Sequence, residues 1–296
     1  MLTADELRQI KRLHVQLNRK VNSPFAGEYR SAFRGLGMEF EEVRPYLPGD
    51  DIRHIDWNVT ARTGHPHIKQ FREERELTLM LVMDVSGSMG FGGGGDDGKT
   101  DKRAVIARLA GALAYSAIRN GDRVGLLAFS DQTEHYLPPR KSRGHAWAVI
   151  RAAYAQGAQG RRTDMGLALE EVGRSLRRRA VVCVLSDFLS AQDGGSVLDA
   201  RAQRALGVLA RRHHLSCFLV NDPLEYALPS VGLVELVDSE TGQRQLVDSA
   251  RVQPSTTVEQ RVHALRRRGA RVAVVGTDMD PFHQLICHFR ALEHLR

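Results

Sequence analysis

Short apolar runs alternate along most of this chain with longer stretches whose apolar residues recur at helical spacing. The run at 77–83 is unbroken, as is typical of a strand buried on both faces of a parallel sheet. Further strands are expected at 124–129, 181–185, 215–220 and 272–275. Helices are expected at 101–119, 165–176, 196–212, 257–268 and 281–294. The alternation predicts an α/β fold with a doubly wound, mostly parallel sheet flanked by helices.

An additional N-terminal part is predicted before this core. An amphipathic helix is expected at 4–22, and the segment 23–76 reads as a folded but irregular cap with Tyr46 and Trp57 as anchors. Charged side chains near a protein interior need partners, so the charged residues of the cap are expected to form a paired network. They are Arg44, Asp50, Asp51, Arg53, Asp56 and Arg62.

A β-hairpin is predicted near 231–247, where two apolar stretches flank a turn that contains Gly242. Short antiparallel strands are an ordinary addition to the edge of an α/β sheet. We therefore expect two parts, an N-terminal helix and cap at 1–76 and an α/β domain with the inserted hairpin at 77–296.

Oxygen-bearing side chains follow the first predicted strand. Asp84, Ser86 and Ser88 occupy alternate positions, and Gly87 permits a tight turn between the serines. Ligands of doubly wound sheets bind beyond the carboxyl ends of the strands, where these residues are placed. Carboxylate and hydroxyl oxygens suit a hard cation such as Mg²⁺, which usually keeps some waters. Taken alone, this fragment is more simply a polar turn.

Two distant residues favour a metal site. Thr163 precedes the helix expected at 165–176, and Asp187 follows the strand expected at 181–185. A residue just after a strand and a residue just before a helix lie on the same edge of such a sheet. Taken singly, Thr163 reads as a helix N-cap and Asp187 as a loop residue. Their joint placement predicts one site for Mg²⁺, with Mn²⁺ or Ca²⁺ as alternatives, formed by Asp84, Ser86, Ser88, Thr163 and Asp187.

These five positions resemble the metal-ion-dependent adhesion site (MIDAS) of the von Willebrand factor type A domain. The resemblance extends from about residue 77 to the C-terminus. It implies a cation at the top of a doubly wound sheet, with one coordination position left open. It further implies that an acidic side chain of a partner protein fills this position. The resemblance therefore implies a binding protein, and we expect no enzyme activity.

The segment 33–57, FRGLGMEFEEVRPYLPGDDIRHIDW, is similar to the signature of the bacterial domain of unknown function 58 family, and Ala61 and Arg62 continue it. Members of that family carry a von Willebrand factor type A domain after this segment and typically accompany MoxR-type AAA+ ATPases. The resemblance implies such an ATPase as a partner, and a role in assembling or remodelling client proteins. Many members also have N-terminal membrane spans. No apolar run here approaches the roughly 20 residues that cross a bilayer, so the chain resembles the short soluble form.

Composition and cysteine usage are consistent with a cytoplasmic protein. The chain has 296 residues, of which 42% are hydrophobic, enough for one large core and a small appendage. Its 3 cysteines form no CxxC pair, so we expect them to be reduced. The helical spacing of His283, Cys287 and His288 also permits a zinc site, although amphipathic helices commonly carry such residues without metal.

The net charge of +7 raises the question of nucleic-acid binding. Arginine runs at 177–179, 211–212 and 266–268 lie near the ends of predicted helices, where cations complement the helix dipole. Aromatic residues, which form stacking platforms for single strands, do not accompany these runs. We therefore expect acidic protein partners rather than nucleic acid.

The segment 93–100, GGGDDGKT, fits the GxxxxGK[ST] pattern of a nucleotide-binding P-loop. An NTPase in which Asp187 holds Mg²⁺ is therefore the alternative to the adaptor. However, the segment does not follow a strand directly, and Asp96 and Asp97 place negative charge where phosphates would lie. The simpler interpretation of the glycine-rich stretch 90–98 is a flexible flap beside the metal site.

Overall fold

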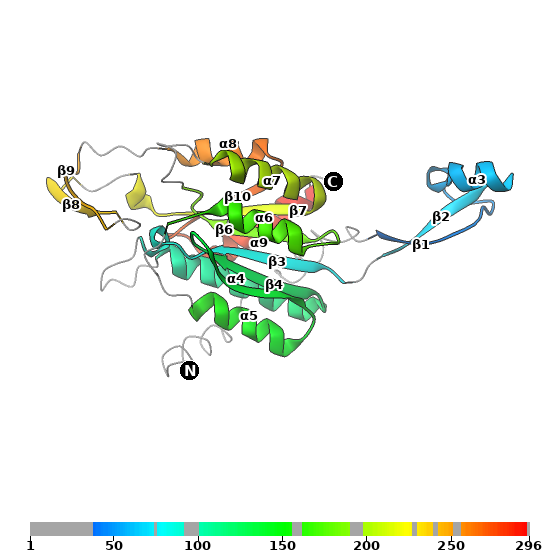
Figure 1. Ribbon diagram of the computed structural model, residues 1–296, viewed down its shortest axis with the longest axis horizontal. Coiled ribbons are helices and arrows are strands. Elements are labelled where there is room, and N and C mark those ends of the chain that lie inside the picture. The colour runs from blue at the N-terminus through cyan, green and yellow to red at the C-terminus, as the bar shows by residue number, and fades with distance from the viewer. Residues whose placement is uncertain are drawn as a thin grey trace. The chain divides into compact units, whose positions relative to one another are not determined.

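A computed structural model of the chain describes residues 38–73, 76–91, 101–155, 162–189, 198–226, 230–238, 242–250 and 256–294. The chain divides into two compact units, one formed by Phe33–Leu77 and the other containing Thr78–Arg296. The helix predicted at 4–22 and the P-loop-like segment 93–100 lie outside the described residues. Figure 1 shows the elements of both units.

The smaller unit is a two-stranded antiparallel ribbon with short helices. β1 (Met38–Pro45) pairs with β2 (His67–Glu73), and the connection between them contains η2 (Ile52–His54) and α3 (Trp57–Thr63). The prediction of an irregular cap was therefore wrong for this part of the chain. Backbone hydrogen bonds between β1 and β2 form a regular ribbon. The many charged residues of this segment had favoured a prediction of irregular structure.

The charged residues of this unit form local pairs rather than one network. Arg44 donates two hydrogen bonds of 2.8 Å to Asp50, and Arg53 lies 2.6 Å from Asp51. Hydrogen bonds from these arginines lower the pKa of Asp50 and of Asp51 to about 2. Trp57, which we expected to anchor the segment, is 70% exposed. Surface pairs of this kind contribute little stability, so the unit depends mainly on its ribbon and caps.

The larger unit contains a six-stranded sheet with strand order β10-β7-β6-β3-β4-β5. Its first five strands are parallel, and β5 pairs with β4 in the antiparallel direction. The doubly wound α/β prediction is confirmed. The strands are β3 (Thr78–Asp84), β4 (Arg123–Phe129), β5 (Thr133–Arg140), β6 (Val181–Ser186), β7 (His214–Asn221) and β10 (Arg271–Gly276).

Helices cover both faces of this sheet (Figure 1). One group packs together through α4, which contacts both α5 and α9, and the other contains the packed pair α6 and α7. None of the helices in the described part of the chain combines the length and apolar character that crossing a bilayer requires. The helices are α4 (Lys102–Asn120), α5 (Arg143–Ala155), α6 (Met165–Ser175), α7 (Ala200–Arg212), α8 (Val258–Arg267) and α9 (Pro281–His294).

The central strand β3 is buried as its unbroken apolar run predicts. Every residue from 79 to 83 is 0% exposed. Burial on both faces fixes the direction of β3, and therefore fixes where the polar residues after Met83 emerge.

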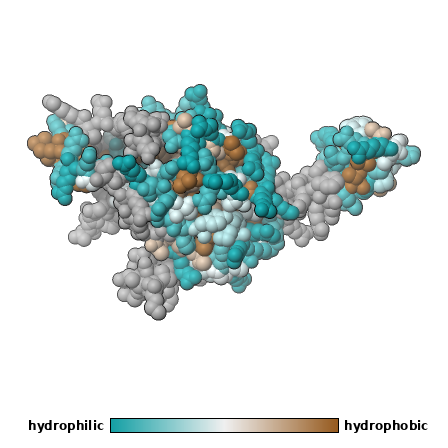
Figure 2. Space-filling view, viewed as in Figure 1, coloured by the Kyte–Doolittle hydropathy of each residue, from teal (hydrophilic) through white to brown (hydrophobic). Residues whose placement is uncertain are grey.

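The predicted hairpin is present as β8 (Leu233–Val237) paired with β9 (Arg244–Asp248). One of its faces exposes Leu233, Val237 and Leu246, each by more than half. Apolar atoms are visible at the hairpin in Figure 2.

Candidate functional site

The candidate site lies where β3 and β6 end side by side. Asp84 is the last residue of β3, and the parallel register that pairs Met83 with Leu185 brings Ser186 next to Asp84. After Asp84 the chain turns into a short 3-10 helix, η3 (Gly87–Gly90), which carries Ser88. The two adjacent strands thus deliver polar groups to one edge of the sheet, as expected for this fold.

The Asp84 carboxylate is held rigidly by its neighbours. Its side chain is buried, with 1% exposure. Oδ1 accepts a hydrogen bond of 3.0 Å from the Ser86 backbone N–H, and Oδ2 accepts one of 2.7 Å from the Ser186 hydroxyl. Each carboxylate oxygen can accept further bonds, so Asp84 keeps capacity for a water or a cation.

The hydroxyls of Ser86 and Ser88 form a pair whose oxygens are 3.2 Å apart. Neighbouring ligands of an octahedral cation lie about 3.0 Å apart when each is about 2.1 Å from the ion, as for Mg²⁺. Ser86 is buried, whereas Ser88 is partly exposed. The serine pair therefore has the spacing and the donor chemistry of two adjacent ligands, with access to solvent on the Ser88 side.

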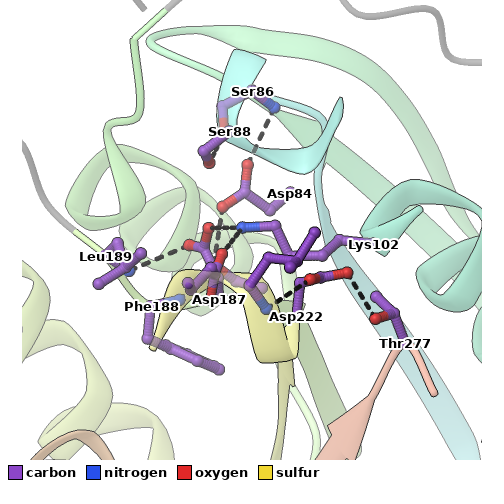
Figure 3. A network of polar contacts seen from close by, with 12 residues as sticks. Asp84, Ser86, Ser88, Lys102, Asp187, Phe188, Leu189, Asp222 and Thr277 are labelled. Atoms are coloured by element: carbon purple, nitrogen blue, oxygen red, sulfur yellow. Dashed lines mark hydrogen bonds and ion pairs between the residues drawn. The ribbon is translucent and has the colours of Figure 1, made fainter. Parts of the chain in front are cut away.

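Two carboxylates are close to each other at this edge. Burial and the charge of Asp187 raise the pKa of Asp84 to about 6, although its hydrogen bonds oppose the shift. Figure 3 shows the Asp84 carboxylate between the serine pair and Asp187. A cation bound here would offset both the lost hydration and the repulsion between the carboxylates. The donor set therefore fits a divalent cation.

Asp187 follows β6 and is fully buried. Its Oδ1 accepts a hydrogen bond of 3.0 Å from the Leu189 N–H, and its Oδ2 accepts one of 2.7 Å from the Lys102 ammonium. Arg261 of α8 donates a hydrogen bond of 2.6 Å to the backbone carbonyl of Asp187. Asp187 is thus held by residues of α4 and α8 and by the backbone of its own loop. Figure 3 shows its contacts with Lys102 and Leu189.

Lys102 is a site residue that the sequence did not indicate. It is 1% exposed and also pairs with Glu225 of η4 (Pro223–Glu225). Burial opposes the positive charge, but Asp187 and Glu225 outweigh burial and raise the pKa of Lys102. Its place directly after Asp101, the N-cap of α4, was readable from the sequence, but its two acidic partners lie 85 and 123 residues away.

Phe188, next to Asp187, has an unusual backbone conformation. Its φ is 54°, in the left-handed region that favours glycine, and its side chain is 0% exposed. A hydrogen bond of 2.9 Å from its N–H to the Ser186 hydroxyl holds this turn. Residues with strained backbone conformations cluster at functional sites, so the conformation of Phe188 favours a functional role for this turn.

Thr163 lies two residues before α6 (Met165–Ser175), close to its predicted place at the start of the helix. The N-cap of this helix is Asp164, not Thr163. The Asp164 N–H donates a 2.8 Å hydrogen bond to the carbonyl of Ser130, just after β4. Thr163 lines a small pocket together with Phe188 and Leu189, the residues that follow Asp187. The structure therefore brings together Asp84, Ser86, Ser88 and Asp187, and a shared cation with the Thr163 hydroxyl stays a prediction.

The alternative zinc site does not form. The His283 ring lies 3.5 Å from the Cys287 sulfur, but His288 is buried and shares a 3.1 Å hydrogen bond with Ser216. Within the ranges that the structure describes, no three His, Cys, Asp or Glu side chains are grouped to hold a metal. The predicted cation site is of another kind, because it combines two carboxylates with hydroxyl groups.

The sequence matches one protein family over most of its length. The family is described as "Protein of unknown function DUF58", and the match covers residues 42–275. The uncharacterized protein Rv1480 of Mycobacterium tuberculosis (strain ATCC 25618 / H37Rv) is 34% identical over 235 residues, which are 79% of this chain and 70% of that protein.

Solved structures to which this chain is similar include a von Willebrand factor type A structure from Catenulispora acidiphila. It is 13% identical, has a TM-score of 0.45, and the similarity covers 76% of this chain and 43% of that chain. Proximal thread matrix protein 1 from the mussel byssus, with a zinc-occupied MIDAS motif, is 14% identical with a TM-score of 0.41. That similarity covers 74% of this chain and 48% of that chain.

Proposed function

This chain belongs to the DUF58 family, and from that premise we propose that its von Willebrand factor type A-like domain binds partner proteins through a divalent cation. The observation that carries the proposal is the meeting of Asp84, the serine pair and Asp187 at the ends of two adjacent strands. The ionised Asp84 carboxylate is disfavoured there by its burial and by the charge of Asp187, and a bound cation would offset both.

The proposal gives each residue a role. The hydroxyls of Ser86, Ser88 and Thr163 are ligands, and Asp84 and Asp187 support the ion directly or through water. When bound, the Mg²⁺ ion offers a coordination position to a carboxylate from outside. The Asp84 carboxylate is fixed by hydrogen bonds from the Ser86 N–H and the Ser186 hydroxyl, so it presents its oxygens without further ordering.

The proposed partner supplies an acidic side chain. A chain with a net charge of +7 also attracts acidic proteins from a distance. From the family resemblance, the proposed partner system includes a MoxR-type AAA+ ATPase, with a role in assembly or remodelling of client proteins. In this proposal the protein is an adaptor, and none of its residues is assigned a catalytic role.

Thermal unfolding in Mg²⁺ or Mn²⁺ tests the site. An ion at a hundred times its dissociation constant stabilises the native state by about 2.7 kcal/mol. We expect this gain for the wild type and for Ser175→Ala, whose hydroxyl bonds the Val172 carbonyl away from the site. Ser88→Ala should lose most of the gain. An unchanged melting temperature of the wild type at millimolar metal would contradict the proposal.

Immobilised protein tests the partner. A purified MoxR-type ATPase should be retained in Mg²⁺, released by EDTA, and not retained by Ser88→Ala. If the ATPase is retained equally in EDTA and by Ser88→Ala, its contact with this protein does not involve the cation site.

A further inference from the structure

The buried lysine at the candidate site has an unusual position. Lys102 is the first residue of α4, where the helix dipole disfavours a positive charge. It is nevertheless 1% exposed, and its ammonium lies 2.7 Å from Asp187. The ring of Phe91 covers it at 5.8 Å from the ammonium. The location of this charge is therefore determined by its acidic partners rather than by its helix.

Lys102 belongs to a cluster of interacting buried charges. Burial and Asp187 act together on Asp84, while Lys102 and Arg261 both attract Asp187 and Glu225. Three carboxylates against two cations leave this cluster with one negative charge. A divalent ion makes it positive by one charge, and the carboxylate of a partner then makes it neutral.

We infer that Lys102 is a resident cation that weakens metal binding and strengthens capture of an acidic ligand. This inference rests on the proposed function and deepens it. Without the ammonium, the cluster with a bound divalent ion is already neutral, so a carboxylate ligand leaves it negative. Lys102 thereby makes the loaded site selective for anions, whereas the metal is held less tightly.

The size of the effect follows from Coulomb's law. A unit charge about 7 Å from a divalent ion changes its binding about tenfold, even at the dielectric constant of water. The effect on a carboxylate ligand has the opposite sign and half the energy at the same distance, which is about threefold in affinity. Lost packing or lost positioning of Asp187 would weaken both metal binding and carboxylate binding. Tighter metal binding together with weaker carboxylate binding therefore distinguishes a charge effect from a structural one.

Three variants of the full chain test the inference. Lys102→Met removes the positive charge and keeps an unbranched side chain. Glu225→Gln removes a negative charge from the same cluster, with little change of shape. The double variant Lys102→Met/Glu225→Gln removes one charge of each sign and is the matched control. Isothermal titration with Mn²⁺ gives metal affinity, and broadening of the acetate methyl proton signal by bound Mn²⁺ reports the carboxylate ligand.

We expect Lys102→Met to bind Mn²⁺ about tenfold more tightly and acetate about threefold more weakly than the wild type, because acetate carries one charge where the ion carries two. Glu225→Gln should weaken Mn²⁺ binding and strengthen acetate binding. The double variant should have Mn²⁺ and acetate affinities close to those of the wild type. If Lys102→Met does not fold, the affinities of Glu225→Gln and of the double variant test the inference. A wild type that does not bind Mn²⁺ would overturn the proposed function and this inference together. Mn²⁺ binding that the single variants leave unchanged, or that all variants weaken, would overturn only the inference.

Discussion

Replacing Asp84 with asparagine should stabilise the metal-free protein and remove its response to Mg²⁺. Burial and Asp187 raise the pKa of Asp84 from 3.8 to about 6. The ionised carboxylate is therefore disfavoured in the folded state, and the free energy of unfolding is reduced by about 3 kcal/mol above pH 6. This cost is relieved as the pH falls from about 6 to 3.8, because the folded state then binds the proton first.

Asparagine removes the charge but keeps most of the geometry. Its side-chain oxygen still accepts the Ser86 N–H, whereas its amide group cannot accept the Ser186 hydroxyl, a loss of about 1 kcal/mol. The expected net gain at about pH 8 in EDTA is about 2 kcal/mol. Urea unfolding with EDTA and with millimolar Mg²⁺ measures both effects.

Asp222→Asn is the matched control for this experiment. Asp222 is a buried aspartate directly after β7, with hydrogen bonds of 2.6 Å from Thr277 and 2.8 Å from Leu224 (Figure 3). This variant should keep the response to Mg²⁺. A metal-free Asp84→Asn protein less stable than the wild type would refute the argument from burial. A full Mg²⁺ response in Asp84→Asn would refute a role of Asp84 in holding the ion.

Two further predictions concern the scaffold. Burial, with Arg271, lowers the pKa of His288 from 6.5 to about 4, so the stability that its neutral ring contributes is present above pH 6.5 and is lost as the pH falls to about 4. His288→Gln should therefore reduce the loss of unfolding free energy between about pH 8 and pH 5 by about 2 kcal/mol, and an unchanged loss would contradict this. Gly125→Ala should destabilise the protein by about 2 kcal/mol or more in denaturant unfolding, because a Cβ there would lie 2.8 Å from the backbone of both Leu137 and Pro139. A variant as stable as the wild type would show that β5 moves away easily.

The strongest periodic elements were predictable from the sequence. The strand expected at 181–185 is observed at Val181–Ser186, and the helix expected at 281–294 is Pro281–His294. Their apolar periodicity is a local property of the chain, and burial in the core agrees with it. Asp84, Ser86, Ser88 and Asp187 could be predicted for the same reason, because they lie at the end of β3 or β6 or within four residues after it.

In the larger unit, one strand and one α-helix were missed, for different reasons. β5 contains Pro138 and Pro139, which exclude a central strand but are tolerated at a sheet edge, so its pairing with β4 decides its structure. α5 carried a readable signal, because its buried residues recur at helical spacing. These residues are Ala146, Val149, Ile150 and Ala153.

The sequence by itself determined most strands and helices of the larger unit and several of the side chains at the sheet edge, because both depend on local pattern. The tertiary structure alone decided the partners of those side chains. Lys102 of α4 contacts Asp187, which follows β6, and Glu225 of η4, and Arg261 of α8 donates to the Asp187 carbonyl. Such charges are unremarkable in a sequence, since their desolvation and their mutual distances arise only when distant elements pack together.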